Sequence, residues 1–238
     1  MKVFILTAGI GSRLKPLTDT QPKVMIKIGP KPILEHLINL CAHHHLTDII
    51  LSTHYLPDQI QNYFKTGENQ GVNIQYSFEA EMVGGGGALK LAENLFQKEP
   101  FIVLNGDVLT NVNLTEMIEF HKEKKALGTF LVHDTDHPLD SDLVEFDSNK
   151  KISKFFRPQP NDQFKPISKT GTHIFESKVL DFIPSNQLFS LEKQLIPLLL
   201  EKSQPLYAYY SSCYSKDMGT LKRLEQVRKD YQDGKTSF

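Results

Sequence analysis

Short apolar runs recur along the first half of the chain, and each ends at a polar or glycine-rich turn. Residues 3–6, 48–53 and 101–104 show no helical spacing, which predicts strands buried on both faces, as in a parallel sheet. Residues 33–41, between the first two runs, place apolar positions at helical spacing, and residues 114–125, after the third run, also read as a helix. Alternating strands and helices predict an α/β fold with a Rossmann-like, mostly parallel sheet covered by helices on both faces.

The second half of the chain continues with strands and a closing helix. Ser190 precedes an apolar stretch and is placed to cap a helix, and residues 221–231 read as the last helix. No repeat or low-complexity segment divides the 238 residues, so we expect one domain covering 1–238. Further strands are predicted over 72–76, 128–132, 143–146, 152–158, 170–175 and 206–210.

Composition narrows the class of protein. Lys and Arg number 27 against 28 for Asp and Glu, so no basic excess indicates a nucleic-acid partner. Cys41 and Cys213 are far apart, which favours a reducing compartment over a disulfide framework. No apolar stretch approaches the ~18 residues that a membrane-spanning helix needs. We therefore expect a cytoplasmic protein with no membrane and no nucleic-acid partner.

A glycine turn follows the first strand. Gly9 and Gly11 lack Cβ atoms, so their backbone amides can approach a phosphate closely. Arg13 follows this turn directly, and Lys23 lies ten residues further on, behind a proline. Two fixed cations of this kind suit a polyphosphate whose charge is held on both sides of the bond being broken.

Two other phosphate-binding patterns fit less well. The dinucleotide-binding motif has a third glycine at the position of residue 14 and an acidic residue at the end of the second strand. This chain has Leu14 and His54 at those positions. A dinucleotide-dependent oxidoreductase is therefore disfavoured. The run G-x-x-x-x-G-K-[ST] of a P-loop does not occur.

Two further features mark the expected ligand crevice. Asp107 follows the strand 101–104, and the carboxyl ends of parallel strands are where open α/β sheets bind ligands. Its carboxylate suits Mg²⁺, which needs one or two carboxylates besides phosphate oxygens. The four glycines 84–87 suit a backbone that lies against a flat ligand, and we do not expect them to serve packing.

The gapped pattern G-x-G-x-R-L-x-P-L-T-x-x-x-P-K from Gly9 to Lys23, followed by Lys31-Pro32, resembles the signature of the sugar-phosphate nucleotidylyltransferases. The resemblance extends over nearly the whole chain, roughly residues 1–230. It implies a nucleotide-diphospho-sugar transferase fold of GT-A-like type. It also implies an Mg²⁺-dependent enzyme that transfers a nucleotidyl group from an NTP to a sugar 1-phosphate, giving an NDP-sugar and pyrophosphate.

The resemblance assigns roles to individual residues. Arg13 and Lys23 are the expected catalytic cations. Asp107 and Asp217, the latter in a D-x-G-T motif, are the expected metal ligands, which predicts that their carboxylates meet on one ion. The expected nucleotide contacts are Thr7, Ala8, Gly9, Gly11, Ser12, Gly84, Gly85, Gly86 and Asn105.

The sugar phosphate is expected to bind Lys169, Gly171 and Glu192. Glu192 stands in an F-S-L-E-K segment whose glutamate, by resemblance, hydrogen-bonds sugar hydroxyls. Lys169 replaces an asparagine that the family often carries, so it either meets the sugar's phosphate or faces solvent. Gly85 likewise replaces a threonine, which leaves a side-chain contact at that position open.

The string H-P-L-D-S-D-L-V over residues 137–144 resembles the D-glycero-D-manno-heptose 1-phosphate guanylyltransferase-like branch of the family. It favours GTP with that sugar, in nucleotide-sugar synthesis for lipopolysaccharide or capsule. UTP, dTTP or CTP with another sugar 1-phosphate stays open, as does an inactive regulatory module that binds nucleotide sugars. The homo-oligomeric state also stays open.

Overall fold

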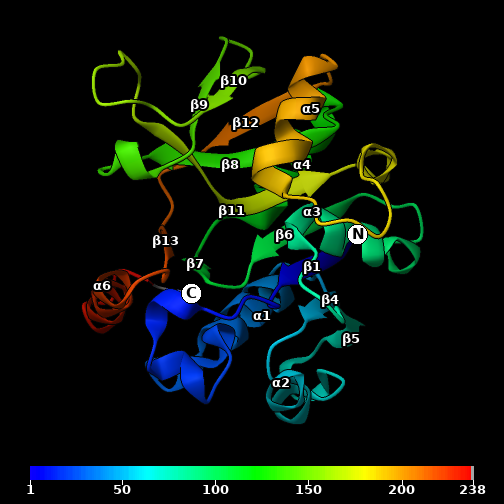
Figure 1. Ribbon diagram of the computed structural model, residues 1–238, viewed down its shortest axis with the longest axis vertical. Coiled ribbons are helices and arrows are strands. Elements are labelled where there is room, and N and C mark those ends of the chain that lie inside the picture. The colour runs from blue at the N-terminus through cyan, green and yellow to red at the C-terminus, as the bar shows by residue number, and fades with distance from the viewer. Residues whose placement is uncertain (237–238) are drawn as a thin grey trace.

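A computed structural model describes residues 1–236. Its centre is a nine-stranded mixed sheet (Figure 1). The four strands of its first half are parallel throughout. In spatial order they are β6 (Phe101–Asn105), β1 (Lys2–Leu6), β4 (Asp48–Thr53) and β5 (Asn73–Phe78). These strands confirm the α/β fold, with its parallel strands, that was predicted from the first half of the chain.

The second half of the sheet is largely antiparallel. The long strand β11 (Ile167–Phe175) runs antiparallel to β6 and connects the two halves. The remaining strands of this half are β8 (Gly128–Asp134), β9 (Leu143–Phe146), β10 (Ile152–Phe156) and β12 (Leu206–Tyr210). Two small ribbons complete the fold: β2 (Lys27–Ile28) with β3 (Lys31–Pro32), and β7 (Val108–Thr110) with β13 (Ser215–Asp217).

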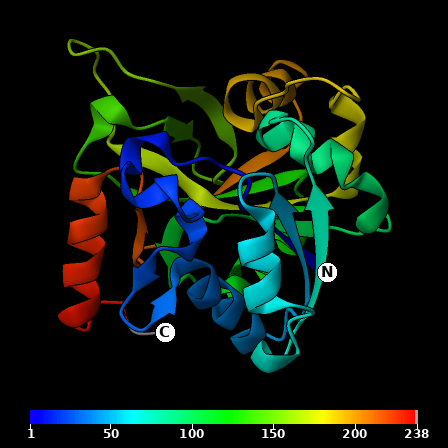
Figure 2. The ribbon, with the colours of Figure 1, turned by 60° about the horizontal axis from the view of Figure 1, so that its bottom comes forward.

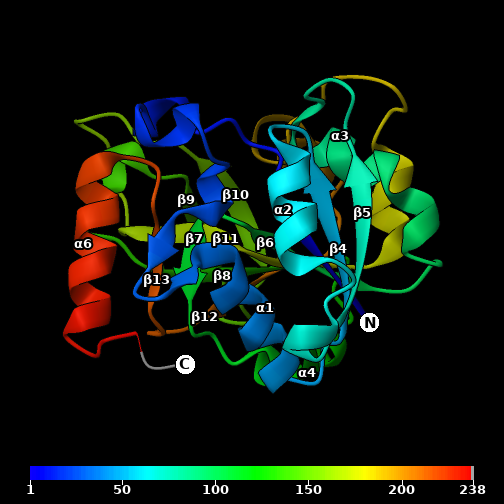
Figure 3. The ribbon, with the colours of Figure 1, turned by 90° about the horizontal axis from the view of Figure 1, so that it is seen from below.

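Side chains of the parallel strands alternate between two apolar layers. In β1, Val3 and Ile5 belong to one buried cluster and Phe4 to the other. The first cluster is covered by α1 (Ile33–His43), α2 (Pro57–Phe64), α4 (Leu114–Lys124) and α6 (Leu221–Gln232), of which Figure 3 shows α1 and α2 in front of the sheet. The second is covered by α3 (Gly84–Leu91) and α5 (Ile196–Glu201). Helices therefore cover both faces, as predicted.

The predicted helix cap at Ser190 is confirmed, but the prediction for the four glycines is wrong in part. Ser190 caps as predicted, because its hydroxyl accepts a hydrogen bond of 3.1 Å from the Lys193 amide. The four glycines, however, open helix α3. A Cβ on Gly86 would lie 2.9 Å from the Phe189 ring, and one on Gly87 would lie 2.9 Å from the Gln187 carbonyl oxygen. A Cβ on Gly84 would likewise lie 2.8 Å from the Phe189 carbonyl oxygen. The expectation that none of these glycines serves packing is therefore wrong for Gly84, Gly86 and Gly87.

Helix α6 lies beside the N-terminal segment, at the edge of the molecule (Figure 2). It is held by the buried carboxylate of Asp230, which is 2.9 Å from the Lys216 ammonium. Burial alone would raise the pKa of Asp230, but hydrogen bonds from Lys216 and Gln226 outweigh it and lower the pKa to about 2. The carboxylate therefore stabilises the fold in its ionised form.

We expect Asp230→Asn to lower the free energy of unfolding by about 2 kcal/mol at pH 7, since it removes a buried charge that several donors share. The folded pKa lies below the ordinary Asp value of about 3.9, so this contribution is complete above about pH 5 and is lost as pH falls towards 2. Urea unfolding at several pH values measures it. The control is Asp233→Asn, a half-exposed partner of Lys235, which should cost under about 0.5 kcal/mol.

Among the described residues, no helix is long and apolar enough to cross a membrane.

Candidate active site

A cavity of about 530 Å³ opens at the carboxyl ends of the parallel strands. It is where the fold brings together residues from distant parts of the sequence, including most of those predicted from motifs. The cavity is lined by Leu6, Thr7, Ala8, Gly9, Ile10, Gly11, Ser12, Arg13, Lys23, Val24, Glu79, Met82, Gly84, Gly85, Asn105, Asp107, Glu192 and Gly219.

The glycine turn after β1 has the backbone features of an anion-binding turn. Gly11 takes a left-handed conformation (φ 70°), and its carbonyl oxygen accepts a hydrogen bond of 2.9 Å from the Thr18 hydroxyl. Within residues 1–236, the amides of Gly9, Gly11 and Ser12 donate no hydrogen bond. Thr7 anchors the start of the turn, because its amide and hydroxyl both bond to Ser52 of β4. The turn therefore presents free N–H groups on a fixed backbone.

Lys23 and Asp107 form an ion pair at the floor of this cavity. Lys23 is positioned by the turn itself, since a Cβ on Gly11 would lie 3.0 Å from the Lys23 Cβ. The Lys23 side chain is 12% exposed and that of Asp107 is 28% exposed. The pair is therefore largely shielded from solvent, but a ligand in the cavity can still contact it. Both predicted residues thus lie at the same point of the site.

The ribbon of β7 and β13 brings the backbone of Asp217, which does not line the cavity, beside that of Asp107. Asp217 pairs with Val108, and the Met218 amide donates to the Asp107 carbonyl oxygen at 2.9 Å. Asp217 is paired with one cation of the chain, since Arg223 Nη1 lies 3.0 Å from both of its carboxylate oxygens. The Gly219 amide also donates to Asp217 Oδ1 at 2.8 Å.

The donor set fits Mg²⁺. The described residues contain no group of three or more His, Cys, Asp or Glu that could hold a metal. Mg²⁺, however, takes one or two carboxylates and completes its shell with water and substrate phosphate. Asp107, directly before β7, and Asp217, at the end of β13, offer two such carboxylates. Each carboxylate is paired with a cation of the chain, Lys23 or Arg223, which a metal would partly replace.

Arg13 lies at the outer end of the turn. A Cβ on Gly219 would lie 3.0 Å from Arg13 Nη2 and 2.7 Å from Asp217 Oδ1. Only a glycine fits at this position of the D-x-G-T motif, because the Arg13 guanidinium and the Asp217 carboxylate both approach it closely. This contact joins the first motif of the chain to the last.

Glu79 is a cavity residue that the sequence analysis missed. It directly follows β5 and is 3% exposed, and burial raises the pKa of its carboxyl group. Its Oε1 atom has no hydrogen-bond partner within residues 1–236. His54, which counted against a dinucleotide site, donates from Nδ1 to the Glu79 carbonyl oxygen at 2.8 Å and so helps to position this acid.

The residues predicted to bind the sugar phosphate have different surroundings. Glu192 lines the cavity, and Lys169 forms an ion pair of 3.2 Å with it. Lys169 does not face solvent, since its side chain is 5% exposed. Gly171 packs against the wall, because a Cβ there would lie 2.7 Å from the Asn105 Cβ. Gly86 lies outside the cavity lining, where the Phe189 ring fills the space beside it.

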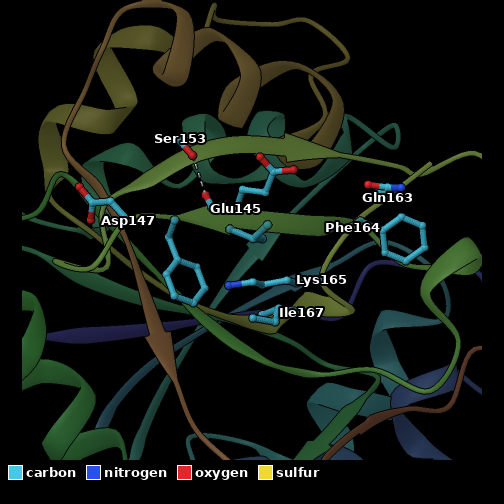
Figure 4. A pocket seen from close by; sticks show the side chains of 9 residues that line it. Glu145, Asp147, Ser153, Gln163, Phe164, Lys165 and Ile167 are labelled. Atoms are coloured by element: carbon cyan, nitrogen blue, oxygen red, sulfur yellow. Dashed lines mark hydrogen bonds between the residues drawn. The ribbon is translucent and has the colours of Figure 1, made fainter.

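A second hollow of about 540 Å³ lies between the β9–β10 hairpin and residues 163–167 (Figure 4). Phe146, Lys165 and Ile167 line it, together with Glu145. It contains none of the residues predicted to contact the nucleotide, the sugar phosphate or the metal. The cavity at the strand ends is therefore the candidate active site.

The fold and the cavity at its strand ends define a protein of the nucleotide-diphospho-sugar transferase fold. The crystal structure of HddC from Yersinia pseudotuberculosis is similar over 97% of this chain and 99% of its own, with a TM-score of 0.82 and 25% identity. The family described as nucleotidyl transferase matches residues 2–234, and the chain belongs to it. This confirms the family inferred from the motifs.

Two curated relatives illustrate the family. A UTP–glucose-1-phosphate uridylyltransferase of Synechocystis is 37% identical over 93% of this chain. A mannose-1-phosphate guanyltransferase of Saccharomyces cerevisiae is 34% identical over 93% of it. The chain spans 61% and 62% of the lengths of these two relatives.

Proposed function

We propose that this chain is a sugar-1-phosphate nucleotidylyltransferase, acting as a single nucleotidyltransferase domain over residues 1–238. A phosphate oxygen of the sugar 1-phosphate attacks the α-phosphorus of an NTP, and the bond to the bridging oxygen breaks, so that pyrophosphate leaves with that electron pair. The observation that carries the proposal is the convergence of free turn amides, Arg13, Lys23 and Asp107 in one cavity.

In the proposed reaction, some residues position the substrates and others neutralise charge. The free amides of the glycine turn and Arg13 hold the β- and γ-phosphates and stabilise the leaving group. Lys23 lies between the α-phosphate and the incoming phosphate, where it offsets charge that grows in the transition state. When bound to Asp107 and Asp217, Mg²⁺ supplies further charge neutralisation. The protein forms no covalent bond, so orientation and electrostatics carry the catalysis.

Glu79 supports GTP as the nucleotide. A guanine presents two neighbouring N–H donors, N1–H and the N2 amino group, along its Watson–Crick edge, and a carboxylate accepts both. Glu79 is buried in the cavity wall with an unpartnered oxygen, which is costly unless a ligand donor meets it. Uracil and thymine present a single N–H between two carbonyl oxygens, which repel a carboxylate.

We expect Glu79→Gln to lower kcat/KM for GTP about 30-fold, because one guanine donor loses its acceptor in a buried site. UTP should be affected less, since a glutamine amide can both donate and accept. Kinetics with each nucleotide, at a fixed sugar 1-phosphate, measure the change. The exposed neighbour serves as the control, and Glu81→Gln should leave both values within about twofold. An equal loss for both nucleotides would contradict a role in reading the base.

The first-choice sugar is D-glycero-D-manno-heptose 1-phosphate. The motif at residues 137–144 supports it, and so does the presence of mannose-1-phosphate guanyltransferases among the relatives, because both sugars have the manno configuration. UTP with glucose 1-phosphate is the second candidate, supported by the relative from Synechocystis.

The reverse reaction tests the proposal without a choice of sugar phosphate. Incubation with pyrophosphate, Mg²⁺ and a set of nucleotide sugars should form an NTP, and GDP-sugars should react fastest. Nucleotide analysis by chromatography detects the product. If no nucleotide sugar is consumed, the proposal of a transferase is wrong for this chain.

A further inference from the structure

We propose that Lys169 is a positioning residue, which holds the Glu192 carboxylate in place to accept hydrogen bonds from sugar hydroxyls, and that it does not bind the sugar's phosphate. The inference rests on the proposed function and deepens it at the sugar end of the cavity. Three observations carry it: the contacts of the ammonium group, the state of His173, and the exposure of Glu192.

All three N–H donors of the Lys169 ammonium are already used. They lie 3.2 Å from Glu192 Oε1, 3.1 Å from the Thr170 carbonyl oxygen and 3.3 Å from His173 Nε2. The side chain is 5% exposed. An ammonium has three donors and no more, so a phosphate would reach Lys169 only by displacing one of these partners.

His173 completes the site around Lys169. It is fully buried, and burial together with the Lys169 charge holds the pKa of its imidazole well below the ordinary value. The ring is therefore neutral, and its Nε2 atom can accept from the ammonium. His173 itself packs against the Phe130 ring at 5.2 Å between centroids. The lysine is thus held by a buried, packed ring as well as by Glu192.

Glu192 is the member of this group that reaches the cavity. It lines the cavity, and its side chain is 32% exposed. Lys169 binds Oε1, while Oε2 accepts no hydrogen bond within residues 1–236. One oxygen of this half-buried carboxylate is held by Lys169, and the other is free to accept a hydrogen bond. Because its orientation is fixed, it accepts only from hydroxyls in a particular position. Because Lys169 neutralises the charge, this acceptor does not repel the sugar's phosphate strongly.

A double-mutant cycle tests the inference. Lys169→Met removes the ammonium at similar length, and Glu192→Gln removes the carboxylate charge. We expect each single variant to raise KM for the sugar 1-phosphate about 20-fold, with kcat and KM for the NTP within about threefold, because an interaction that acts on one substrate is lost. In the Glu192→Gln background, Lys169→Met should add less than twofold. Calorimetric binding of the sugar 1-phosphate gives a second readout that needs no turnover.

The control is Lys90→Met. Lys90 is similarly screened, 17% exposed, and its ammonium binds Glu93 at 3.0 Å and the Leu180 carbonyl oxygen at 3.2 Å, away from the cavity lining. It should leave both KM values unchanged. Thermal midpoints of all variants show whether each is folded, and Lys169→Gln, which keeps a donor, replaces Lys169→Met if the latter is not.

The outcomes are separable. If Lys169→Met raised KM for the sugar 1-phosphate by the same factor in the wild-type and Glu192→Gln backgrounds, Lys169 would bind the phosphate directly. That result would overturn the inference. Loss of NTP binding in Lys169→Met would overturn it as well. Absence of turnover by the wild-type chain with any substrate pair would count against the proposed function, and the cycle would then be judged on calorimetric binding of the sugar 1-phosphate alone.

Discussion

Lys23→Met is expected to lower kcat about a thousandfold, with KM for the NTP changed less than about fivefold. The Lys23 ammonium lies in the cavity beside Asp107. In the proposed reaction it offsets the charge that develops as the sugar phosphate attacks. Methionine keeps much of the volume and removes the charge, so the loss falls on the transition state. Initial rates of pyrophosphate release at saturating substrates measure it.

Lys15→Met provides the matched control. Lys15 belongs to the same segment, but its side chain is 59% exposed and pairs with Asp19 on the surface. It should keep kcat within about twofold of wild type, as surface changes of this kind do. If Lys23→Met kept a tenth or more of the wild-type kcat while remaining folded, the role of Lys23 at the reacting phosphates would be wrong.

Asp107→Asn is expected to lower kcat at least about a thousandfold and to weaken Mg²⁺ activation, since an amide is a poor ligand for a hard cation. The substitution keeps the shape of the side chain. It also releases Lys23 from its ion pair, so the loss reflects both effects. Activity titrations with Mg²⁺ and, separately, calorimetric binding of Mg²⁺ with a non-hydrolysable NTP analogue measure the change.

Asp217→Asn should shift the Mg²⁺ titration in the same direction, because both carboxylates are assigned to one ion. Asp233→Asn, at the end of α6, should not. If Asp217→Asn lost activity while its Mg²⁺ dependence matched that of wild type, the pairing with Arg223 would be its main function, and the assignment of Asp217 to the metal would be contradicted.

The features that sequence analysis predicted correctly have local causes. The first strand is an uninterrupted apolar run, and Gly11 needs a left-handed backbone that follows directly from its place in the turn. Asp107 follows from a general rule, since the carboxyl end of a central parallel strand faces the ligand crevice. The same rule, applied to the strand before Glu79, would have found that residue too.

The features that it missed depend on contacts between distant parts of the chain. Asp140 and Arg223 lie 83 positions apart and meet at 2.6 Å, and Arg223 in turn holds Asp217. No spacing in the sequence indicates this. Lys169 was expected to meet phosphate or to face solvent. Its side chain is buried, and its ammonium contacts His173 on the same strand and Glu192 on the helical segment after Ser190.

The glycines of α3 show why residue type alone misleads. Some glycines leave room for a ligand and others leave room for a side chain of the protein. The sequence alone does not distinguish these two roles. At Gly85 a Cβ would meet ordinary contacts of 3.4 Å and beyond, and the residue lines the cavity. At Gly86 the approaching group is the Phe189 ring. The packing of the neighbouring loop separates the two cases.

Pyrophosphate release from a matrix of the four common NTPs against several sugar 1-phosphates, with Mg²⁺, tests the central claim most directly. The account predicts release with GTP and a manno-configured sugar 1-phosphate, and the release should be abolished by Asp107→Asn. Release with UTP and glucose 1-phosphate instead would keep the transferase and overturn the nucleotide choice. No release from any pair, despite NTP binding, would contradict the central claim and favour a regulatory module that binds nucleotide without turnover.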